Sequence, residues 1–307
     1  MKKLLTLAVS LFFAHNSHSQ IIFSANFDDE TLGGMTIVDN DGLEAASGLA
    51  FFEDAWTVSN PIFEDVFEIM SPCVLSHSRY MPVGTSDDWL ISPQMTIEEL
   101  GTSVLWKVRS LSVNSRSSME VRVSTTDNDL SSFTDVIYSS EEELPVLTQK
   151  LASLNDYIGE QIYIAFVNNS TDKYLMLVDD IIVQPIGLED IAISSFVTNP
   201  YQLKNQEFDI EIQIDNNGGE ELNSFDFVWS HGSEEYRETF TGISLKTGES
   251  QSFISSSPFM VDDNIVYPLE ISIHNPNGNT ETNLSDNTIS TEVFGIAYIP
   301  ARKVVGE

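Results

Sequence analysis

Carboxylates are the residues of this sequence whose types and spacing could do chemistry. The run Asp39-Asn40-Asp41-Gly42 has the acid, amide, acid and glycine order of the front half of an EF-hand loop. Ala50 stands at the twelfth loop position, where such a loop needs a glutamate, and no helical pattern flanks the run. Asp39 and Asp41 therefore predict either a tight turn built on Asn and Asp side chains or a calcium loop of another kind.

A second acidic pair, Asp87 and Asp88, opens the stretch SDDWLISPQ of residues 86–94. Trp89 and Leu90 are expected to enter the core, and Pro93 ends the strand where its missing N–H does least harm. A structural role in the strand and core accounts for this motif, but Asp87 or Asp88 is also a candidate second cation ligand. The run of residues 127–129, Asp-Asn-Asp, predicts only a hairpin turn.

Groups for nucleophilic or acid–base catalysis are poorly arranged. Cys73 and His77 are four residues apart, but no motif surrounds them, so a buried cysteine beside a turn histidine is expected. A glycosidase would need a distinct carboxylate pair, and the glutamates of residues 141–143 are more typical of a solvated loop. We therefore predict that the chain is not an enzyme.

Aromatic side chains crowd an irregular, acidic stretch before Cys73: Phe51, Phe52, Trp56, Phe63 and Phe67. Exposed, they would form a shelf that stacks on sugar rings or on the apolar surface of a partner. Buried, they would fill the core or pack a long loop.

The charge balance restricts the partners. The chain has 47 acidic and 14 basic residues, a formal net charge of -33. Nucleic acid is excluded as a partner because neutralising phosphates takes clustered Lys and Arg, which are scattered singly here. Such acidity favours solubility and divalent cations.

The beginning of the chain resembles an export signal. Lys2 and Lys3 precede an apolar run over residues 4–14, and small residues precede Gln20, so residues 1–19 predict a signal peptide. The run is too short to span a bilayer, which takes about 20 apolar residues, and no later segment reaches that length. We expect an exported protein, secreted, on the cell surface or in the periplasm of a Gram-negative bacterium. The only cysteine, Cys73, excludes an intramolecular disulfide and lies too far from the signal to carry a lipid anchor.

The elements that must position these residues are β-strands. Met119, Val121 and Val123 alternate with polar residues, and the same period of two returns in many short runs bounded by Asn, Asp, Gly or Pro. This pattern predicts an all-β protein of packed sandwiches, with helical turns only near residues 97–100 and 151–158.

The length of 307 residues and the break at residues 185–187, Pro-Ile-Gly, predict two domains joined by a short, exposed hinge. We place them at residues 20–185 and 186–295. Residues 296–307 are expected to start a further strand or a truncated domain.

Three stretches of the first domain, in order, carry a family resemblance: Phe27-Asp28 followed by VDNDG at residues 38–42, then SDDWLISPQ, then IYIAFVNNSTDKYLMLVDDIIV at residues 162–183. Together they resemble the cleaved adhesin family, also called choice-of-anchor J. The resemblance implies a jelly roll over residues 22–184. It also implies a structural calcium between Asp28 and one of Asp179 and Asp180, because strand alternation sends those two side chains to opposite faces. The alternative is a turn cap and a solvated surface residue.

Residues 188–294 are similar to the CARDB-type immunoglobulin-like domains of bacterial surface proteins, through FDIEIQIDNNGGEELNSFDFVW, LKTGESQSF and NLSDNT. Residues 300–307 resemble the lead-in strand of envelope thioredoxin-like proteins, without the cysteine motif that follows it there. Sequence patterns of this kind indicate a fold and do not by themselves indicate a catalytic or binding site.

These features predict a jelly roll followed by an immunoglobulin-like sandwich, acting as a secreted or surface-exposed adhesion module. It would recognise a protein or glycan ligand and contain structural calcium. Two alternatives stay open: accessory domains of a thiol-disulfide protein whose catalytic part lies beyond Glu307, and a purely structural stalk. The ligand and the oligomeric state stay open as well.

Overall fold

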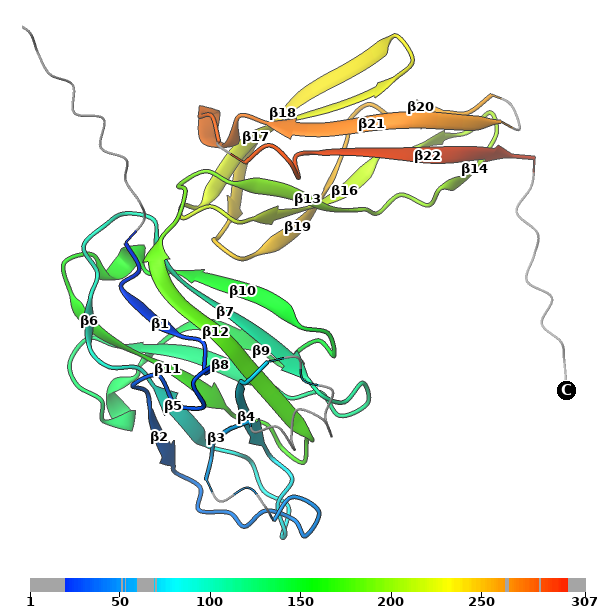
Figure 1. Ribbon diagram of the computed structural model, residues 1–307. Coiled ribbons are helices and arrows are strands. Elements are labelled where there is room, and N and C mark those ends of the chain that lie inside the picture. Colours follow the sequence, from blue (N-terminus) through cyan, green and yellow to red (C-terminus); the bar gives the residue numbers. More distant parts are fainter. Residues whose placement is uncertain are drawn as a thin grey trace, which may run out of the picture.

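The computed structural model describes residues 20–50, 52, 54–59, 69, 71–262, 265–281 and 283–297. They form two β-assemblies, one from β1 to β12 and one from β13 to β22 (Figure 1). The helical content of these residues is three short 3-10 turns: η1 (Leu130–Ser132), η2 (Asn155–Tyr157) and η3 (Pro276–Gly278). No helix in the described part of the chain is long and apolar enough to cross a membrane.

The first assembly is a sandwich of two six-stranded sheets, as expected. One sheet has the order β10-β7-β12-β4-β3, with β1 also on β12; its strands are β1 (Phe23–Ala25), β3 (Thr57–Val58), β4 (Val74–His77), β7 (Thr102–Ser110), β10 (Thr148–Ser153) and β12 (Leu175–Pro185). The other has the order β2-β5-β11-β8-β9, with β6 also on β11; its strands are β2 (Thr36–Asp39), β5 (Asp88–Ile91), β6 (Met95–Thr96), β8 (Met119–Ser124), β9 (Asp135–Ser140) and β11 (Gln161–Asn168). All pairings in this sandwich are antiparallel, and the long β12 binds β4 with its first half and β1 with its second.

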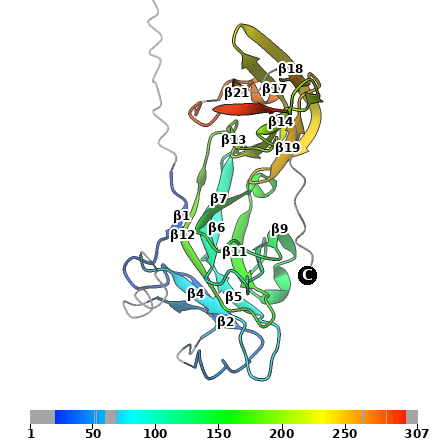
Figure 2. The ribbon, with the colours of Figure 1, turned by 90° about the vertical axis from the view of Figure 1, so that its right-hand side faces the viewer.

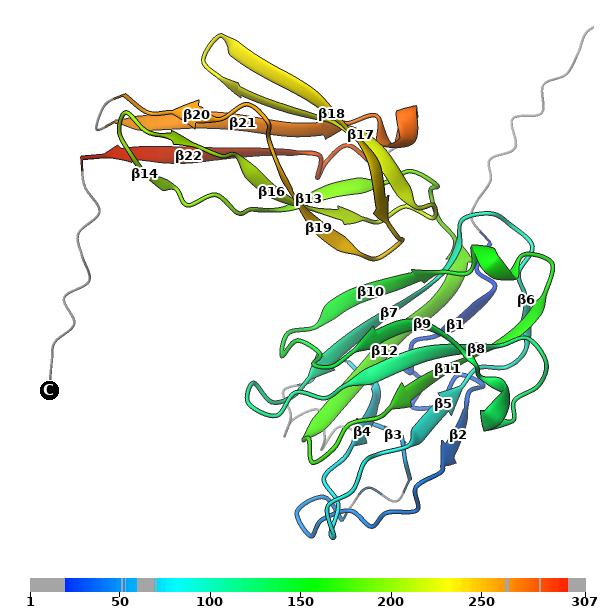
Figure 3. The same ribbon diagram turned by 180° about the vertical axis from the view of Figure 1, so that it is seen from behind.

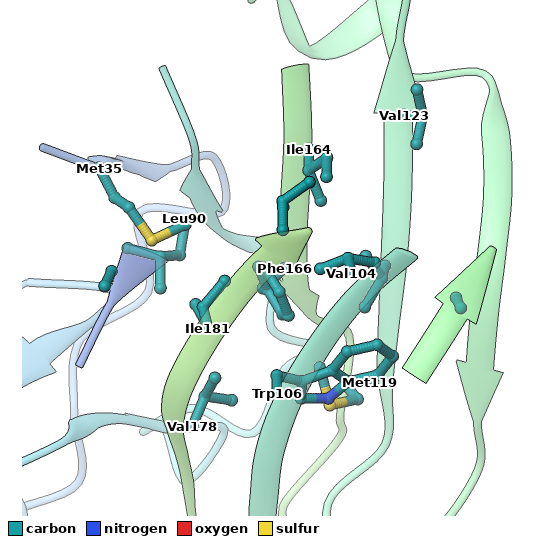
Figure 4. Packing of buried hydrophobic residues seen from close by; sticks show 14 of the residues in the cluster. Met35, Leu90, Val104, Trp106, Met119, Val123, Ile164, Phe166, Val178 and Ile181 are labelled. Carbon is teal, nitrogen blue, oxygen red and sulfur yellow. The ribbon is translucent and has the colours of Figure 1, made fainter. Parts of the chain in front are cut away.

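The main core lies between these two sheets (Figure 4). Met119, Val121 and Val123 point into it from β8, which confirms the alternation expected there. Trp106 from β7 meets Phe166 from β11 edge to face, with ring centroids 5.7 Å apart. Burial of such large apolar side chains is the dominant favourable contribution to folding.

Loops cover parts of the outer faces of the sheets. Phe52 and Cys73 join a separate apolar cluster over β4 and β12, and Trp56 is fully buried in the main core. For Phe52 and Trp56, core filling is therefore correct and an exposed aromatic shelf is wrong. Phe51, Phe63 and Phe67 lie outside the described residues.

The second assembly is an immunoglobulin-like sandwich (Figure 2). Its smaller sheet has the order β13-β16-β19, with β13 (Ile191–Phe196), β16 (Glu211–Asn216) and β19 (Ser250–Ile254). Its larger sheet has the order β14-β22-β21-β17-β18, with β14 (Tyr201–Leu203), β17 (Leu222–His231), β18 (Glu234–Leu245), β21 (Val266–His274) and β22 (Thr288–Ile296). A short ladder joins β15 (Glu207–Phe208) to β20 (Phe259–Met260).

This second sandwich has a core of its own, which shares no residue with the first. Phe225, Phe227 and Trp229 alternate along β17 and point into it. The indole N–H of Trp229 donates to Ser255 Oγ at 3.0 Å, so its polar atom is satisfied despite burial.

The segment between the two sandwiches is not the open hinge that the Pro-Gly break suggested. The backbone N–H of Ile186 donates to the carbonyl of Gly101 at 3.1 Å, and that of Gly219 donates to the carbonyl of Gly187 at 2.8 Å. The connecting residues are therefore held by one sandwich on each side (Figure 3). The segment is short and Leu188 in it is exposed, as expected, but turns of both sandwiches supply hydrogen-bond partners for its main chain.

A direct contact joins the sandwiches at Asn155 in η2. Its Nδ2 donates to the carbonyl of Gly219 at 2.7 Å, and its Oδ1 accepts from the N–H of Gly101 at 2.8 Å. A Cβ on Gly219 would lie 2.6 Å from the Cα of Gly101, so only glycine fits this approach. η2 falls within the stretch where a helical turn was expected, whereas residues 97–100 form a loop and turn.

Several expectations fall on parts of the chain without a description. Residues 1–19, the predicted signal peptide, lie outside the described residues, as does the thioredoxin-like lead-in at residues 300–307. Ile296 ends β22 and belongs to the second sandwich rather than to a new strand.

Candidate functional site

A group of three carboxylates lies at one end of the first sandwich. Asp39 is the last residue of β2, Asp88 is the first residue of β5, and the antiparallel register places them directly opposite each other. Asp41 follows in the turn after β2, and one carboxylate oxygen from each of the three lies within 4.8 Å of the others. Across the described residues, this is the one group of three or more acidic, His or Cys side chains with that spacing.

The turn after β2 fixes the two outer members. The N–H of Gly42 donates to Asp39 Oδ1 and that of Leu43 donates to Asp41 Oδ1, both at 2.7 Å. Gly42 has φ +61°, a left-handed conformation that glycine adopts at little cost. Asp41 Oδ2 also accepts from the N–H of Asp87 at 2.7 Å, which ties the turn to the start of β5. The expected Asx turn is present, and it holds both carboxylates beside Asp88.

Asp88 is the buried member, with an exposed fraction of 2 %. Its Oδ2 accepts from Ser86 Oγ at 2.7 Å, Tyr80 Oη at 3.0 Å and Ser76 Oγ at 3.3 Å. The pKa of Asp88 is raised to about 7, chiefly by burial; the hydrogen bonds from Ser86 and Tyr80 oppose this rise, and the nearby carboxylates of Asp41 and Asp39 add to it. Close to neutral pH this group therefore changes charge readily.

A cavity of about 50 Å³ adjoins the group, and its lining includes Asp39, Asp54, His77, Tyr80 and Asp88. This space exceeds the roughly 10 to 15 Å³ that one water molecule needs, so an ion with some of its waters fits. Burial lowers the pKa of His77 to about 4, so the imidazole is neutral and supplies no positive charge. None of the residues that line the cavity is Lys or Arg.

The donor set is suited to a hard cation. Every candidate ligand is an oxygen, and calcium takes six to eight oxygens from carboxylates, carbonyls and water. In the described part of the chain, neither Asp39 Oδ2 nor Asp88 Oδ1 accepts a hydrogen bond, so each keeps its lone pairs for a ligand. Asp39, Asp41 and Asp88 therefore fit a calcium ion.

Asp28, Asp179 and Asp180 do not form such a group. Asp28 is exposed and accepts from Asn26 Nδ2 at 2.6 Å. Asp180 binds Lys107 Nζ at 2.6 Å, so an ammonium group already neutralises it. Asp179 is 5 % exposed, and burial raises its pKa to about 6. A calcium ion between the opening and closing strands stays a prediction.

The alternation expected at Asp179 and Asp180 is interrupted. The register of β12 on β7 shifts between Asp179 and Ile182, and Asp180 has φ 47°. Such a β-bulge places an extra residue in one strand and redirects its side chains. Asp179 lies opposite Lys107, and Lys107 also binds Asp180, so the two carboxylates share one cationic neighbour.

The other candidates from the sequence have structural surroundings. Cys73 lies in an apolar cluster, while His77 packs its ring against Phe52 and Tyr80. The N–H of Asp129 donates to Asp127 Oδ1 at 3.1 Å, which is the expected turn.

Within residues 141–143, Glu142 pairs with Arg116, whereas Glu143 is 1 % exposed and accepts from Tyr138 Oη at 2.7 Å. The solvated loop expected for this run is therefore wrong at Glu143.

Sequence reasoning missed the neighbours that hold Asp88. Ser76 and Tyr80 come from β4 and the loop that follows it, and no spacing along the chain connects them to residues 86–88. It also missed Asp190, Glu281 and Asp286 of the second sandwich, which come from segments about 90 residues apart along the chain.

Solved structures that are similar to parts of this chain include a cleaved adhesin domain, a CARDB domain and a domain of a putative cell surface protein. No family model and no curated protein matches the chain. Among solved structures, the K1 cleaved adhesin domain of Lys-gingipain from Porphyromonas gingivalis is 20% identical, with a TM-score of 0.42, over 54% of this chain and 98% of that chain. The CARDB domain of a Pyrococcus furiosus protein, in complex with di-metal ions, is 16% identical, with a TM-score of 0.30, over 36% and 90%. A domain of a putative cell surface protein from Methanosarcina acetivorans is 22% identical, with a TM-score of 0.29, over 36% and 95%.

Proposed function

We propose that the protein is a non-catalytic binding module of an exported, surface-exposed protein, and that calcium stabilises its first sandwich. The observation that carries this proposal is the meeting of Asp39, Asp41 and Asp88 within 4.8 Å beside a small cavity. Three carboxylates this close repel one another strongly unless protons or a cation neutralise them. A divalent cation would remove that repulsion and join β2, the turn after it and β5.

The experiment is scanning calorimetry of the protein with calcium and with a chelator. Calcium at 100 times its dissociation constant adds about 2.7 kcal/mol to the folded state. For a sandwich of this size, that raises the unfolding midpoint of the first sandwich by roughly 5 to 11 °C. Magnesium is expected to help less, because it requires smaller octahedral geometry and releases its waters reluctantly.

Two variants make the result specific. Asp88→Asn keeps the shape and one oxygen of the side chain but removes its charge, so most of the calcium response of the first sandwich is expected to disappear. Asp129→Asn removes a charge from an exposed turn outside the group and is expected to keep the response. Equal midpoints with calcium and with chelator for the unaltered protein would refute the calcium site.

A groove on the larger sheet of the second sandwich favours a glycan among the candidate ligands. It has a volume of about 710 Å³, and its lining includes Ser230, Pro268, Glu270, Ser290, Glu292 and Phe294. Hydroxyl and carboxylate groups hydrogen-bond sugar hydroxyls, and an aromatic face stacks on a sugar ring. Phe294 of this lining stacks on Tyr201, which lies outside the lining and is 56 % exposed, so aromatic surface adjoins the groove.

Binding of the protein to a glycan array tests this second element of the proposal. Phe294→Ala and Glu270→Gln are expected to weaken binding of any glycan found, because they remove the stacking face and a charged acceptor. Glu207→Gln, on an exposed position of β15 outside the groove, is the matched control. Binding that survives both groove variants, or binding only to proteins, would exclude this groove as the glycan site.

A further inference from the structure

Three carboxyl groups of the second sandwich converge on the start of β13. Asp190 directly precedes Ile191, whose N–H donates to Glu281 Oε2 at 2.7 Å. Two residues further on, the N–H of Ile193 donates to the carbonyl of Asp286 at 2.9 Å. The segment between η3 and β22 is therefore tied to the beginning of β13, although about 90 residues separate the two along the chain (Figure 1).

Oxygen atoms in this cluster are buried without partners. Oδ1 of Asp190, Oδ1 of Asp286 and Oδ1 of Asn287 each lack a hydrogen-bond donor. Asn287 is 2 % exposed, and its Nδ2 donates to Glu281 Oε1 and to the carbonyl of Ile273 at 3.3 Å, so Oδ1 is the atom of its carboxamide that lacks a partner. A buried acceptor without a donor destabilises the folded state, and three of them in one hydrogen-bonded cluster indicate a missing partner.

The charges around the cluster are all of one sign. Burial raises the pKa of Asp190, and the carboxylate of Asp286 raises it further. Burial likewise raises the pKa of Glu281, with added repulsion from Asp190 and Asp286 that its hydrogen bonds oppose. Asn283 donates to Asp286 Oδ2 at 3.1 Å and also stabilises Asp190, but an amide carries no charge. The ion pairs of the described residues all lie elsewhere.

We propose that the second sandwich binds a divalent cation of the calcium type between Asp190, Asp286 and Asn287, a site separate from that of the first sandwich. The three partnerless oxygens are its protein ligands, and water completes the six to eight positions that calcium takes. Glu281 acts as a positioning residue, because it fixes the Asn287 carboxamide and the N–H of Ile191. A monovalent cation would leave the two carboxylates only half neutralised.

The cation would strengthen the junction between the sandwiches. Glu189, next to Asp190, accepts from Asn277 Nδ2 at 3.0 Å and Asn279 Nδ2 at 2.7 Å. The carbonyl of Asp190 accepts from the N–H of Asn217 at 2.8 Å, beside the glycine turn that contacts the first sandwich. The same ion therefore fixes the connecting residues to the second sandwich.

The test is isothermal titration calorimetry of the full protein with calcium chloride. Asp88→Asn isolates the second site, and Asp88→Asn combined with Asp286→Asn is expected to bind no calcium. The matched control combines Asp88→Asn with Asp209→Asn, an exposed aspartate of the second sandwich, and is expected to keep about one ion per chain. If Asp88→Asn alone bound no calcium, the second site would be overturned and the first site would stand. If Asp88→Asn kept one ion and the added Asp286→Asn removed it, the second site would be supported.

A measurement on the unaltered protein covers the case in which a variant fails to fold. The side-chain amide resonances of Asn283 and Asn287 are expected to shift during a calcium titration followed by NMR, because these amides contact the proposed ligands. Unchanged resonances at saturating calcium would show that Asp190, Glu281 and Asp286 share protons instead, and would overturn the proposal.

Discussion

Asp39 and Asp88 lie directly opposite each other on neighbouring antiparallel strands, with Asp88 buried. Like charges at directly opposed positions destabilise a sheet, and burial of one of them adds a desolvation penalty. Two events relieve this cost: protonation of Asp88 or binding of a cation. The competition between these two events makes the site sensitive to pH.

Calcium affinity at the first site is expected to fall as the pH falls. Burial raises the pKa of Asp88 to about 7, and a ligand carboxylate must lose its proton before it binds the ion. Between about pH 8 and pH 5.5, competition with a group of that pKa lowers the affinity by about 30-fold. Titration calorimetry on Asp286→Asn, in which the first site is the one that remains, measures this dependence. An affinity that is constant over this range would show that Asp88 does not bind the ion.

Without calcium, the protein is expected to become more stable as the pH falls from about 8 toward 6.5, a range above the one in which the depressed pKa of His77 opposes the trend. The pKa values of Asp88, Asp179, Glu143, Asp190 and Glu281 are all raised, chiefly by burial. A group with a raised pKa binds more protons in the folded state than in the unfolded state. Its contribution to stability is therefore full below the unfolded pKa and is lost as the pH rises through the folded pKa. Thermal unfolding in chelator at several pH values measures the trend.

The contribution of Asp88 to this trend can be isolated. In chelator near pH 8, Asp88→Asn is expected to unfold no lower than the unaltered protein, because it removes a buried charge and the hydroxyl partners can rotate to suit an amide. Its stability is also expected to depend less on pH. A variant that is strongly destabilised in chelator and keeps the full pH slope would contradict the raised pKa.

The strand pattern was predictable from the sequence, because alternation is local. Met119, Val121 and Val123 are buried as their spacing indicates, and the turn after β2 follows from its Asn, Asp and Gly residues. The acidic turn was also recognised as a candidate cation site. The resemblance to a cleaved adhesin domain and to a CARDB-type domain also predicted the order of the two sandwiches along the chain.

The remaining features depend on contacts between distant segments. The bulge at Asp180 is a departure from alternation that no residue type in the strand signals. Asp88 becomes a buried neighbour of Asp39 only through the pairing of β2 with β5. The cluster at Asp190 needs Glu281 and Asp286 from a loop far along the chain, so sequence spacing could not reveal it.

Replacement of Asp28 and Asp180 together by Asn is expected to preserve the calcium response of the first sandwich. Asp180 already pairs with Lys107, and Asp28 is exposed, so neither is required by the group at Asp88. A half-exposed ion pair of this kind contributes at most about 1 kcal/mol, so the fold is expected to persist. Calorimetry with calcium and with chelator gives the result. A lost response would place the ion between the opening and closing strands instead.

The close contact between the sandwiches is expected to depend on a glycine at the junction. Gly248, in the turn between β18 and β19, has φ +81°, and a Cβ there would lie 2.2 Å from the carbonyl oxygen of Leu151 in β10 of the first sandwich. Gly242 has φ +69° with no atom within 4 Å of its Cβ position, so it provides a matched control. Alanine at either position costs about 1 to 2 kcal/mol of left-handed strain. Only Gly248→Ala adds a clash with the first sandwich.

Gly248→Ala is therefore expected to separate the sandwiches, while Gly242→Ala leaves their contact intact. Small-angle scattering reports the change as a larger radius of gyration, and limited proteolysis reports it as faster cleavage near residues 186–190. In the unaltered protein the hydrogen bonds of Ile186 and Gly187 protect this segment, because proteases need exposed, unpaired backbone. The domain boundary proposed there predicts two stable fragments once the contact opens. Equal scattering and equal cleavage rates for both variants would show that the sandwiches move independently of the Gly248 contact.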